Sequence, residues 1–354
     1  MKNTIYITAT IVATVVGAGF ATGQEIYSFF NVYGKGSLLG IVIMLFGFVF
    51  AFYTVLRYCF VRRIDSFSAF LTELLPRKFG KMIYVCVALF SFCGLCAMAS
   101  ATGALFLQSF KLPYFAGVFA LLIICFLILI FNISGIARLN LYLTPLICLG
   151  LVYFSVRGFL FREVATFSAH YYRNILQICL SAILYVSYNI LSVVVVLCSM
   201  RQYADNLRNI RLSCAAAGLM LAILALMIWS VIELYADKII LGEIPLLQIS
   251  ARSGTVHEII YGIILLASVL TTAVGCGYAT VQFIKQSLHC QTLVAALIAV
   301  LSVVPVCYFG FSGIVRVLYT FFGFLGMPFL LILIYSQLKL MRTCKNKLKN
   351  MKNE

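Results

Sequence analysis

The sequence predicts an all-α membrane protein, and three observations support that prediction. Of its 354 residues, 64% are hydrophobic. Only 10% are charged, and the mean hydropathy is +1.09, whereas about 25% of the residues in a soluble domain are charged. The apolar residues form runs close to the roughly 20 residues that a helix needs to cross a bilayer. These features exclude an ordinary soluble protein, and we find neither a soluble domain nor an internal linker.

Ten such runs follow one another along the chain. The predicted spans are 4–32, 37–59, 80–109, 114–133, 139–158, 174–199, 212–235, 256–284, 291–309 and 314–338. The first run follows Lys2 and resembles a signal peptide, but its apolar continuation to Phe30 favours a retained span. Glu233 falls near the end of the seventh span, where we expect it to be solvated.

The basic residues predict the orientation. The net charge of +16 could suggest nucleic-acid binding, but the Lys and Arg residues lie in loops between apolar runs. Orientation in the membrane and contact with anionic lipid explain that placement better. Ten spans put both termini on one side, and the basic segments 57–81 and 339–352 lie there. The positive-inside rule predicts that this side is cytoplasmic and that 339–354 is a basic cytoplasmic tail.

The order of the spans predicts an internal repeat within one transmembrane domain, residues 1–338. The halves, about 4–158 and 174–338, contain five spans each, and an odd number inverts the second half relative to the first. The third and eighth spans are long and occupy corresponding positions. We therefore expect a ten-helix bundle built as a 5+5 inverted repeat.

The first span carries the most informative motif, Val15-Val-Gly-Ala-Gly-Phe-Ala-Thr-Gly-Gln-Glu25. Glycine weakens a helix, and free backbone groups at membrane depth survive only inside protein or beside a watery cavity. Secondary transporters build midplane sites from such broken helices. Glu25 is expected to face a cavity between spans one, three, six and eight, where it could bind a substrate ammonium or relay a proton. It could also simply be a first-turn acid stabilised by the helix dipole.

The sixth span stands opposite the first in the repeat and carries Tyr185-Val-Ser187-Tyr188-Asn189. We predict a second discontinuous helix here, although this segment has no glycine or proline. Its polar side chains could contact substrate or could hydrogen-bond between helices. Before the eighth span, residues 242–248 predict a short helix at the outer surface.

These features resemble the LeuT-fold amino acid–polyamine–organocation transporter superfamily over essentially the whole chain. The strings Gly17-Ala-Gly-Phe-Ala-Thr-Gly-Gln-Glu25, Phe29-Phe30, Gly34-Lys-Gly36 and Tyr185–Asn189 resemble more closely a bacterial family of that fold, the YkvI type. The resemblance implies a multi-pass protein of the bacterial cell (inner) membrane. It also implies that a substrate carboxylate meets exposed amides at the break. The implied substrate-binding residues are Gly17, Ala18, Gly19, Phe20, Thr22, Gly23, Glu25, Ser187, Tyr188 and Asn189.

The resemblance also implies one Na⁺ site. In sodium-coupled relatives, carbonyls before the break of the first span join hydroxyls of the eighth span. The matching groups here are the carbonyls of Ala13 and Val16, the carbonyl of Ser268, and the hydroxyls of Thr271 and Thr272. Those hydroxyls could instead bond back to the preceding turn. Some relatives have an asparagine for a second sodium where this chain has Phe20, so we expect no second site.

The predicted function is secondary transport of a small organic solute, an amino acid or related amine, coupled to Na⁺ or H⁺. The predicted partners are that solute and membrane lipids, with no cofactor beyond a Na⁺ ion and no nucleic acid. The alternative is a receptor or sensor that keeps the fold without transporting. Gly310-Phe-Ser312-Gly313 resembles an intramembrane serine protease motif, but His170, His257 and His289 fall near loops or span ends. A serine nucleophile needs a nearby base, so we expect no enzyme.

Overall fold

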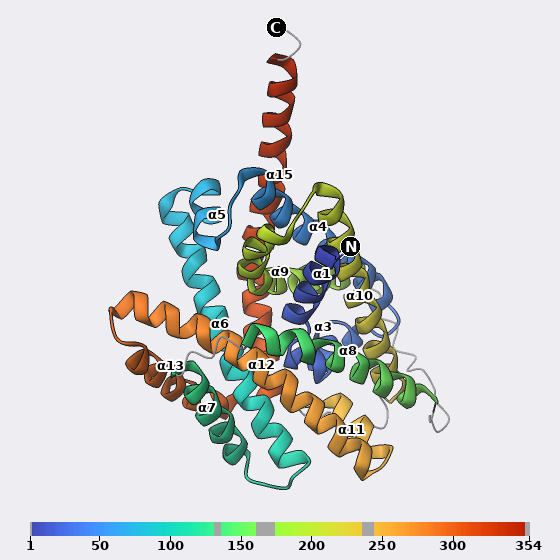
Figure 1. Ribbon diagram of the computed structural model, residues 1–354. Helices are drawn as coiled ribbons and strands as arrows, with labels where there is room; N and C mark the ends of the chain where they lie inside the picture. Colours follow the sequence, from blue (N-terminus) through green and yellow to red (C-terminus); the bar gives the residue numbers. More distant parts are fainter. Residues whose placement is uncertain (1, 131–135, 161–173, 236–243, 351–354) are drawn as a thin grey trace.

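The chain forms a helical bundle, seen in a computed structural model that describes residues 2–130, 136–160, 174–235 and 244–350 (Figure 1). No β-strand occurs in these ranges, so the predicted all-α class is confirmed. The principal helices are α1 (Lys2–Val15), α2 (Ala18–Ala21), α3 (Gln24–Phe29), α4 (Ser37–Arg62), α5 (Phe67–Leu74), α6 (Arg77–Gln108), α7 (Tyr114–Ile130), α8 (Ile136–Leu160), α9 (Ile175–Met200), α10 (Leu207–Leu234), α11 (Pro245–Arg252), α12 (Thr255–Leu288), α13 (Thr292–Val306), α14 (Phe311–Ile314) and α15 (Thr320–Asn350).

Short non-α turns join several of these helices. The 3₁₀ turns are η1 (Asn31–Tyr33), η2 (Arg201–Tyr203) and η3 (Cys307–Phe309), and η4 (Val315–Tyr319) is a π-helical turn between α14 and α15. The short helix expected near 242–248 is α11, which starts with Pro245 in its first turn; residues 242 and 243 lie outside the described ranges. Beyond the last predicted span, α15 continues without interruption to Asn350.

Membrane-length helices dominate the part of the chain that the structure describes. Seven helical segments there are long and apolar enough to span a bilayer, and the shorter apolar helices Asn3–Val15, Tyr114–Ile130 and Pro145–Leu160 occupy the first, fourth and fifth predicted spans. Large apolar side chains face outward, among them Phe46 (68% exposed) and Leu149 (68% exposed). A soluble monomer rarely exposes so many large apolar side chains, whereas lipid covers them in a membrane protein.

The helices pack in two groups that meet around the first three helices. In one group α4 packs on α9 and α10, α1 packs on α10 and α9, and α15 lies along α9. In the other group α6 packs on α12 and α7, and α13 packs on α12. The N-terminus and the C-terminal end of α15 lie toward one end of the bundle, and α11 lies toward the other (Figure 1).

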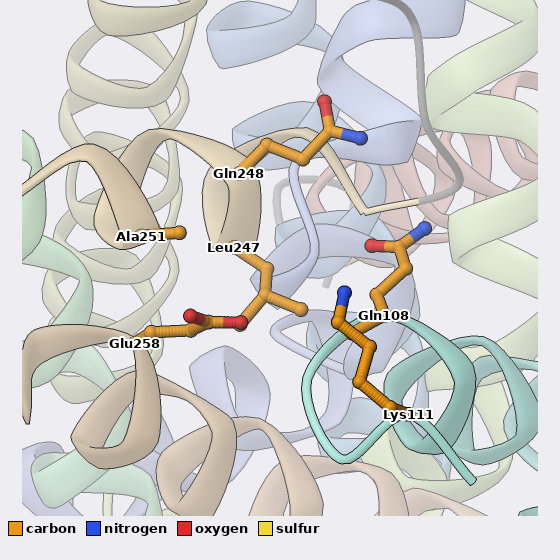
Figure 2. Close-up of a pocket in the computed structure, with 6 residues that line it drawn as sticks. All are labelled: Gln108, Lys111, Leu247, Gln248, Ala251 and Glu258. Carbon is orange, nitrogen blue, oxygen red and sulfur yellow. The ribbon is translucent and has the colours of Figure 1, made fainter. Parts of the chain in front are cut away.

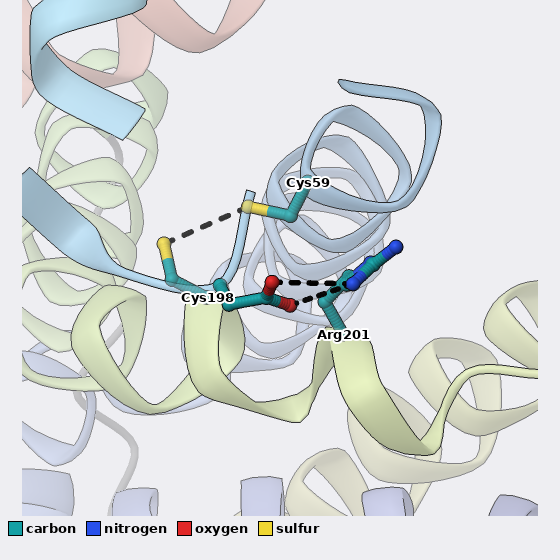
Figure 3. Close-up of polar contacts among 4 residues, drawn as sticks. Cys59, Cys198 and Arg201 are labelled. Atoms are coloured by element: carbon teal, nitrogen blue, oxygen red, sulfur yellow. Dashed lines mark hydrogen bonds and ion pairs between the residues drawn. The ribbon is translucent and has the colours of Figure 1, made fainter. Parts of the chain in front are cut away.

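At the termini end, a sulfur contact joins α4 to α9, and an ion pair joins the segments that follow these two helices (Figure 3). The Sγ atoms of Cys59 and Cys198 are 3.7 Å apart, and both side chains are fully buried. Beside them the Arg201 guanidinium donates to both carboxylate oxygens of Asp65, at 2.9 and 3.2 Å. This packing fixes α9 relative to α4, and α9 carries the tyrosines of the site described next.

Candidate functional site

The glycine-rich motif of the first span breaks the helix as predicted. The amide of Gly17 donates to the carbonyl of Val15 (2.8 Å) rather than to that of Ala13 four residues earlier. One turn, α2, follows before Gly23 adopts a left-handed conformation (φ 78°) and α3 begins at Gln24. Glycine adopts this conformation without the steric cost that other residues meet. The chain therefore changes course twice within the motif.

The backbone around Thr22 and Gly23, where the chain turns for the second time, is stabilised by hydrogen bonds. The Thr22 hydroxyl donates to the carbonyl of Gly19 (2.9 Å) and accepts from the amide of Gln24 (3.2 Å). Tyr261 of α12 donates its hydroxyl to the carbonyl of Ala21. The amide of Leu246, on α11, donates to the carbonyl of Thr22 (3.2 Å). Backbone groups freed by the break are thus satisfied by side chains and by α11.

Glu25 lies at the centre of the site. Its side chain is 5% exposed, and its Oε2 accepts hydrogen bonds from Tyr188 (2.7 Å) and Tyr185 (3.4 Å). Its other oxygen, Oε1, lies so close to Gly19 that a Cβ there would overlap it. Among the described residues no Lys, Arg or His forms an ion pair with it. The hydrated, cavity-facing acid expected from the sequence is therefore a buried, hydrogen-bonded acid, because two tyrosines of α9 close over it.

Aromatic rings from five elements form a cluster around the two tyrosines that bind Glu25. Tyr188 packs against Phe29 of α3 (5.4 Å between ring centroids), Phe90 of α6 (6.1 Å) and Tyr319 of η4 (5.0 Å). Tyr185 packs against Phe48 of α4 (5.9 Å). Ring faces carry partial negative charge and attract cations. The combination of one carboxylate, two hydroxyls and several ring faces suits a small organic cation or ammonium group.

The predicted break in the sixth span is wrong. Helix α9 runs uninterrupted from Ile175 to Met200. Its polar residues bond to their own helix: the Ser187 hydroxyl donates to the carbonyl of Ile183 (2.7 Å), and the Asn189 amide donates to that of Tyr185 (3.0 Å). Of the three predicted contacts on α9, only Tyr188 reaches Glu25. Polar side chains at helical spacing can satisfy the preceding turn without opening it.

Of the five residues proposed for Na⁺, Thr272 lies beside Gly17, at the first turn of the break. A Cβ on Gly17 would lie 3.2 Å from Thr272 Oγ1, so α12 touches the motif at this point. The hydroxyls of Thr271 and Thr272 both donate to the carbonyl of Ser268, at 2.9 and 3.0 Å. The Ser268 hydroxyl is buried and has no hydrogen-bond partner among the described residues. The structure therefore brings Thr272 beside Gly17, and the sodium site itself stays a prediction.

Two other predicted site residues, Phe20 and Gly23, have packing roles. Phe20 is fully buried in the hydrophobic core, and the side chain of Ala18 lies outside what the structure describes. Gly23 packs under Leu246 of α11, where a Cβ would come within 2.9 Å of Cγ. Gly23 thus shapes the backbone and allows close packing.

Sequence reasoning missed several members of the site. Tyr319, Phe90 and Phe29 were not among the predicted contacts, and neither was the hydroxyl of Tyr185. In a chain that contains 30 Phe and 20 Tyr residues, an aromatic residue in an apolar run carries no local signal. Glu233, expected to be solvated, is 2% exposed, and Asn31 donates to it at 3.3 Å.

A cleft opens beside the site on the side of the termini. Its volume is about 660 Å³, and α5, α6, α9 and α12 line it, with Arg77 and Lys81 on α6 and Val195 on α9. It reaches Val87 and Ser91 on α6, which flank Phe90. The ring of Phe90 contacts Tyr188, so the aromatic cluster is next in sequence on α6 to residues that line this cleft.

No family model matches the sequence. Two proteins of Bacillus subtilis strain 168 are similar over most of their length. The uncharacterised protein YyaD is 26% identical over 329 residues, which cover 92% of this chain and 94% of YyaD. The uncharacterised membrane protein YkvI is 23% identical over 322 residues, which cover 90% of this chain and 92% of YkvI. The predicted resemblance to the YkvI type is thus confirmed.

Solved structures identify the fold. The Eremococcus coleocola manganese transporter matches 92% of this chain and 77% of its own with a TM-score of 0.66 at 16% identity. MhsT, in complex with L-phenylalanine, matches 92% of this chain and 87% of its own with a TM-score of 0.61 at 18% identity. The chain has the LeuT fold. In this LeuT-fold chain, the broken first helix and Glu25 lie against α9, α6 and α12.

Within the described ranges, the serine motif and the histidines lie on different helices. Ser312 lies in α14, and the two histidines within the described ranges, His257 and His289, lie at opposite ends of α12. His170 lies outside those ranges.

Proposed function

We propose that this chain is a secondary active transporter of a small organic solute, an amino acid or related amine, coupled to Na⁺ or H⁺. The observation that carries the proposal is the buried Glu25 at the break of the first span, capped by Tyr188 and Tyr185. Burying an acid that has no cationic partner costs free energy, and ionisable residues inside a membrane segment therefore usually mark a functional site. The transporter fold and the break around this acid support the same conclusion.

The chemistry of the site favours an ammonium group. A substrate ammonium would meet Glu25 and the ring faces of Tyr188 and Tyr319, which suit a cation. Its carboxylate would meet the backbone amides at the start of α2, because free N–H groups at such a break favour anions. MhsT, in complex with L-phenylalanine, supports an amino acid. The manganese of the other neighbour fits less well, since Mn²⁺ takes several oxygen ligands and Glu25 offers one carboxylate.

Two coupling ions remain as separate predictions. Na⁺ would bind the carbonyls of Ala13, Val16 and Ser268 with the hydroxyls of Thr271 and Thr272. Hydroxyls and carbonyls supply a hard cation with oxygens without burying a second charge. Alternatively, Glu25 would carry a proton, which neutralises it when the solute leaves.

Access would alternate by movement of one helix group against the other. In this proposal the ten spans form a 5+5 inverted repeat and both termini are cytoplasmic, so the 660 Å³ cleft opens to the cytoplasm. Phe90 and Tyr188 would then have to part to let the solute reach Glu25. Rocking of one repeat-derived bundle around a midplane site is the common mechanism of such folds.

Uptake into proteoliposomes tests the proposal. A thermal-shift screen of the purified protein against amino acids and amines, with and without Na⁺, identifies a ligand, because ligand bound to the folded state raises its stability. Radiolabelled ligand is then offered to proteoliposomes with an imposed Na⁺ gradient or an imposed pH gradient. Accumulation driven by one gradient supports transport. Binding without accumulation under either gradient would instead identify the receptor alternative.

Glu25→Gln separates the roles of the acid in this assay. Glutamine keeps an oxygen that can accept from Tyr188, so the protein should fold. Loss of the charge should weaken binding of an ammonium solute by about 2 kcal/mol or more. If the pH dependence of uptake disappears in this variant, Glu25 carries the proton. Unchanged uptake at every pH would leave it as a first-turn acid.

A further inference from the structure

A second pocket lies at the end of the molecule opposite the termini. It encloses about 300 Å³ between the end of α6, helix α11 and the start of α12, and Figure 2 shows its lining. Its residues are Gln108, Lys111, Leu247, Gln248, Ala251 and Glu258. They share no residue with the Glu25 site. A volume of roughly this size is at the small end of ligand pockets in proteins.

The pocket carries one charge of each sign on facing walls. Lys111 follows α6, and Glu258 lies in the first turn of α12. Neither forms an ion pair within the part of the chain that the structure describes. Leu247 of α11 lies between them in Figure 2, and Ala251 of α11 also lines the pocket. Opposite charges kept apart across a small cavity match a molecule that carries both an ammonium and an anionic group.

The local structure holds the lysine in place. Its Nζ donates to the carbonyl of Gln108 (2.9 Å), at the end of α6 where helix carbonyls favour a cation. Lys111 has a positive φ of 55°, a conformation that costs a non-glycine residue energy and often marks a functional position. The side-chain oxygen of Gln108 is buried and has no hydrogen-bond partner among the described residues. A ligand ammonium could satisfy this oxygen.

We infer that this outer pocket binds a small zwitterion, whose anionic group lies on Lys111 and whose ammonium lies on Glu258 and the Gln108 amide oxygen. A free amino acid and a phosphatidylethanolamine headgroup share that chemistry. The inference does not depend on transport, because no residue of the pocket belongs to the Glu25 site.

Helix α11 connects the pocket to the break. Leu247 lines the pocket, and the preceding residue, Leu246, bonds through its amide to Thr22 and packs on Gly23. A ligand that fills the space between Lys111 and Glu258 would also contact Leu247, and would in this way hold α11 against the break of the first span. The bound ligand should therefore slow the local unfolding of α11. Backbone hydrogen exchange in Pro245–Arg252 measures this effect.

The experiment measures hydrogen–deuterium exchange of α11 in the full-length protein, in nanodiscs of phosphatidylglycerol alone or with phosphatidylethanolamine. L-Alanine is the soluble probe, and ethylamine and propionate carry only one charge each. Protection by L-alanine in phosphatidylglycerol discs identifies a free zwitterion. Protection that appears only with phosphatidylethanolamine identifies the lipid headgroup. Absence of protection in both, or equal protection by the single-charge probes, would overturn the inference.

Substitutions in the pocket test whether the protection of α11 from exchange comes from ligand bound there. Lys111→Met and Glu258→Gln should each raise the concentration for half-maximal protection by about tenfold, since a hydrogen bond to a charged group is worth roughly that factor. Lys35→Met, an exposed lysine outside the pocket, is the matched control and should behave as wild type. Glu25→Gln should also keep the protection, which distinguishes this pocket from the transport site. Protection that survives both pocket substitutions would contradict the assignment.

Discussion

The first span and α9 show that polar residues and glycines affect a membrane helix differently. Both segments place polar residues inside an apolar run, and both were expected to be discontinuous. In the first span the glycines let the backbone turn at Gly17 and Gly23. In α9 the side chains of Ser187 and Asn189 bond to the preceding turn and the helix stays whole. The break thus depends on backbone freedom, and the intact helix provides a rigid support for Tyr185 and Tyr188.

The largest effect is expected from filling the space that the break needs. In Gly19→Leu the new side chain would overlap the carboxylate of Glu25. Such overpacking costs about 1–3 kcal/mol, and displacement of Glu25 should abolish uptake. Gly275→Leu is the matched control, because a Cβ at this exposed position on α12 meets nothing within 4 Å. Thermal denaturation and uptake are measured for both; wild-type uptake by Gly19→Leu would show that the motif does not shape the site.

The second-largest effect is expected from removing the hydroxyls by which α9 binds Glu25. Tyr188→Phe removes the 2.7 Å hydrogen bond to Glu25 and leaves a buried acceptor short of a donor, which costs about 1–3 kcal/mol. Tyr185→Phe should cost less, because its contact is 3.4 Å and therefore weak. Unfolding free energy and solute affinity check the order. Equal losses in the two variants would mean that the hydroxyls do not act through Glu25.

Substitutions where α12 meets the break are expected to change the sodium dependence of uptake selectively. Thr272→Val keeps the shape of the side chain and removes the hydroxyl beside Gly17. Thr271→Val removes the hydroxyl of the preceding residue. Each should raise the Na⁺ concentration for half-maximal uptake by about tenfold. Thr280→Val is the control, since its hydroxyl makes the same kind of intrahelical bond (2.8 Å) further along α12. Uptake that is driven by protons and indifferent to Na⁺ would rule out the sodium site.

The smallest effect is expected in α9 itself. Ser187→Ala removes a hydroxyl that only bonds back to Ile183, so the unfolding free energy should change by less than about 0.5 kcal/mol and uptake should stay near wild type. Hydrogen exchange across Ile175–Met200 should also remain slow and uniform. A large loss of uptake in Ser187→Ala would indicate that this hydroxyl turns toward the solute in another state.

Local properties of the sequence explain what could be predicted. The apolar runs specify helices because each apolar residue favours burial in lipid, and most of the described helices overlap the predicted runs, whereas α5 was not predicted. The break was predictable because Gly17 and Gly23 need no distant partner to relax the backbone. The break in α9 was wrongly predicted because the fate of Ser187 and Asn189 depends on whether their side chains turn inward to their own helix. That choice is set by packing against neighbouring helices.

The sequence alone therefore determined the membrane class, the positions of the helices, the flexible motif and the acid within it. Only the tertiary structure decided what surrounds that acid. Tyr185 and Tyr188 stand 160 and 163 residues away along the chain, and Thr272 reaches Gly17 from α12. Contacts at such separation depend on how whole helices pack, and an aromatic or hydroxyl side chain in an apolar run does not show which neighbour it will meet. The physical reason is that helix formation is local, whereas the chemistry of the site depends on long-range packing.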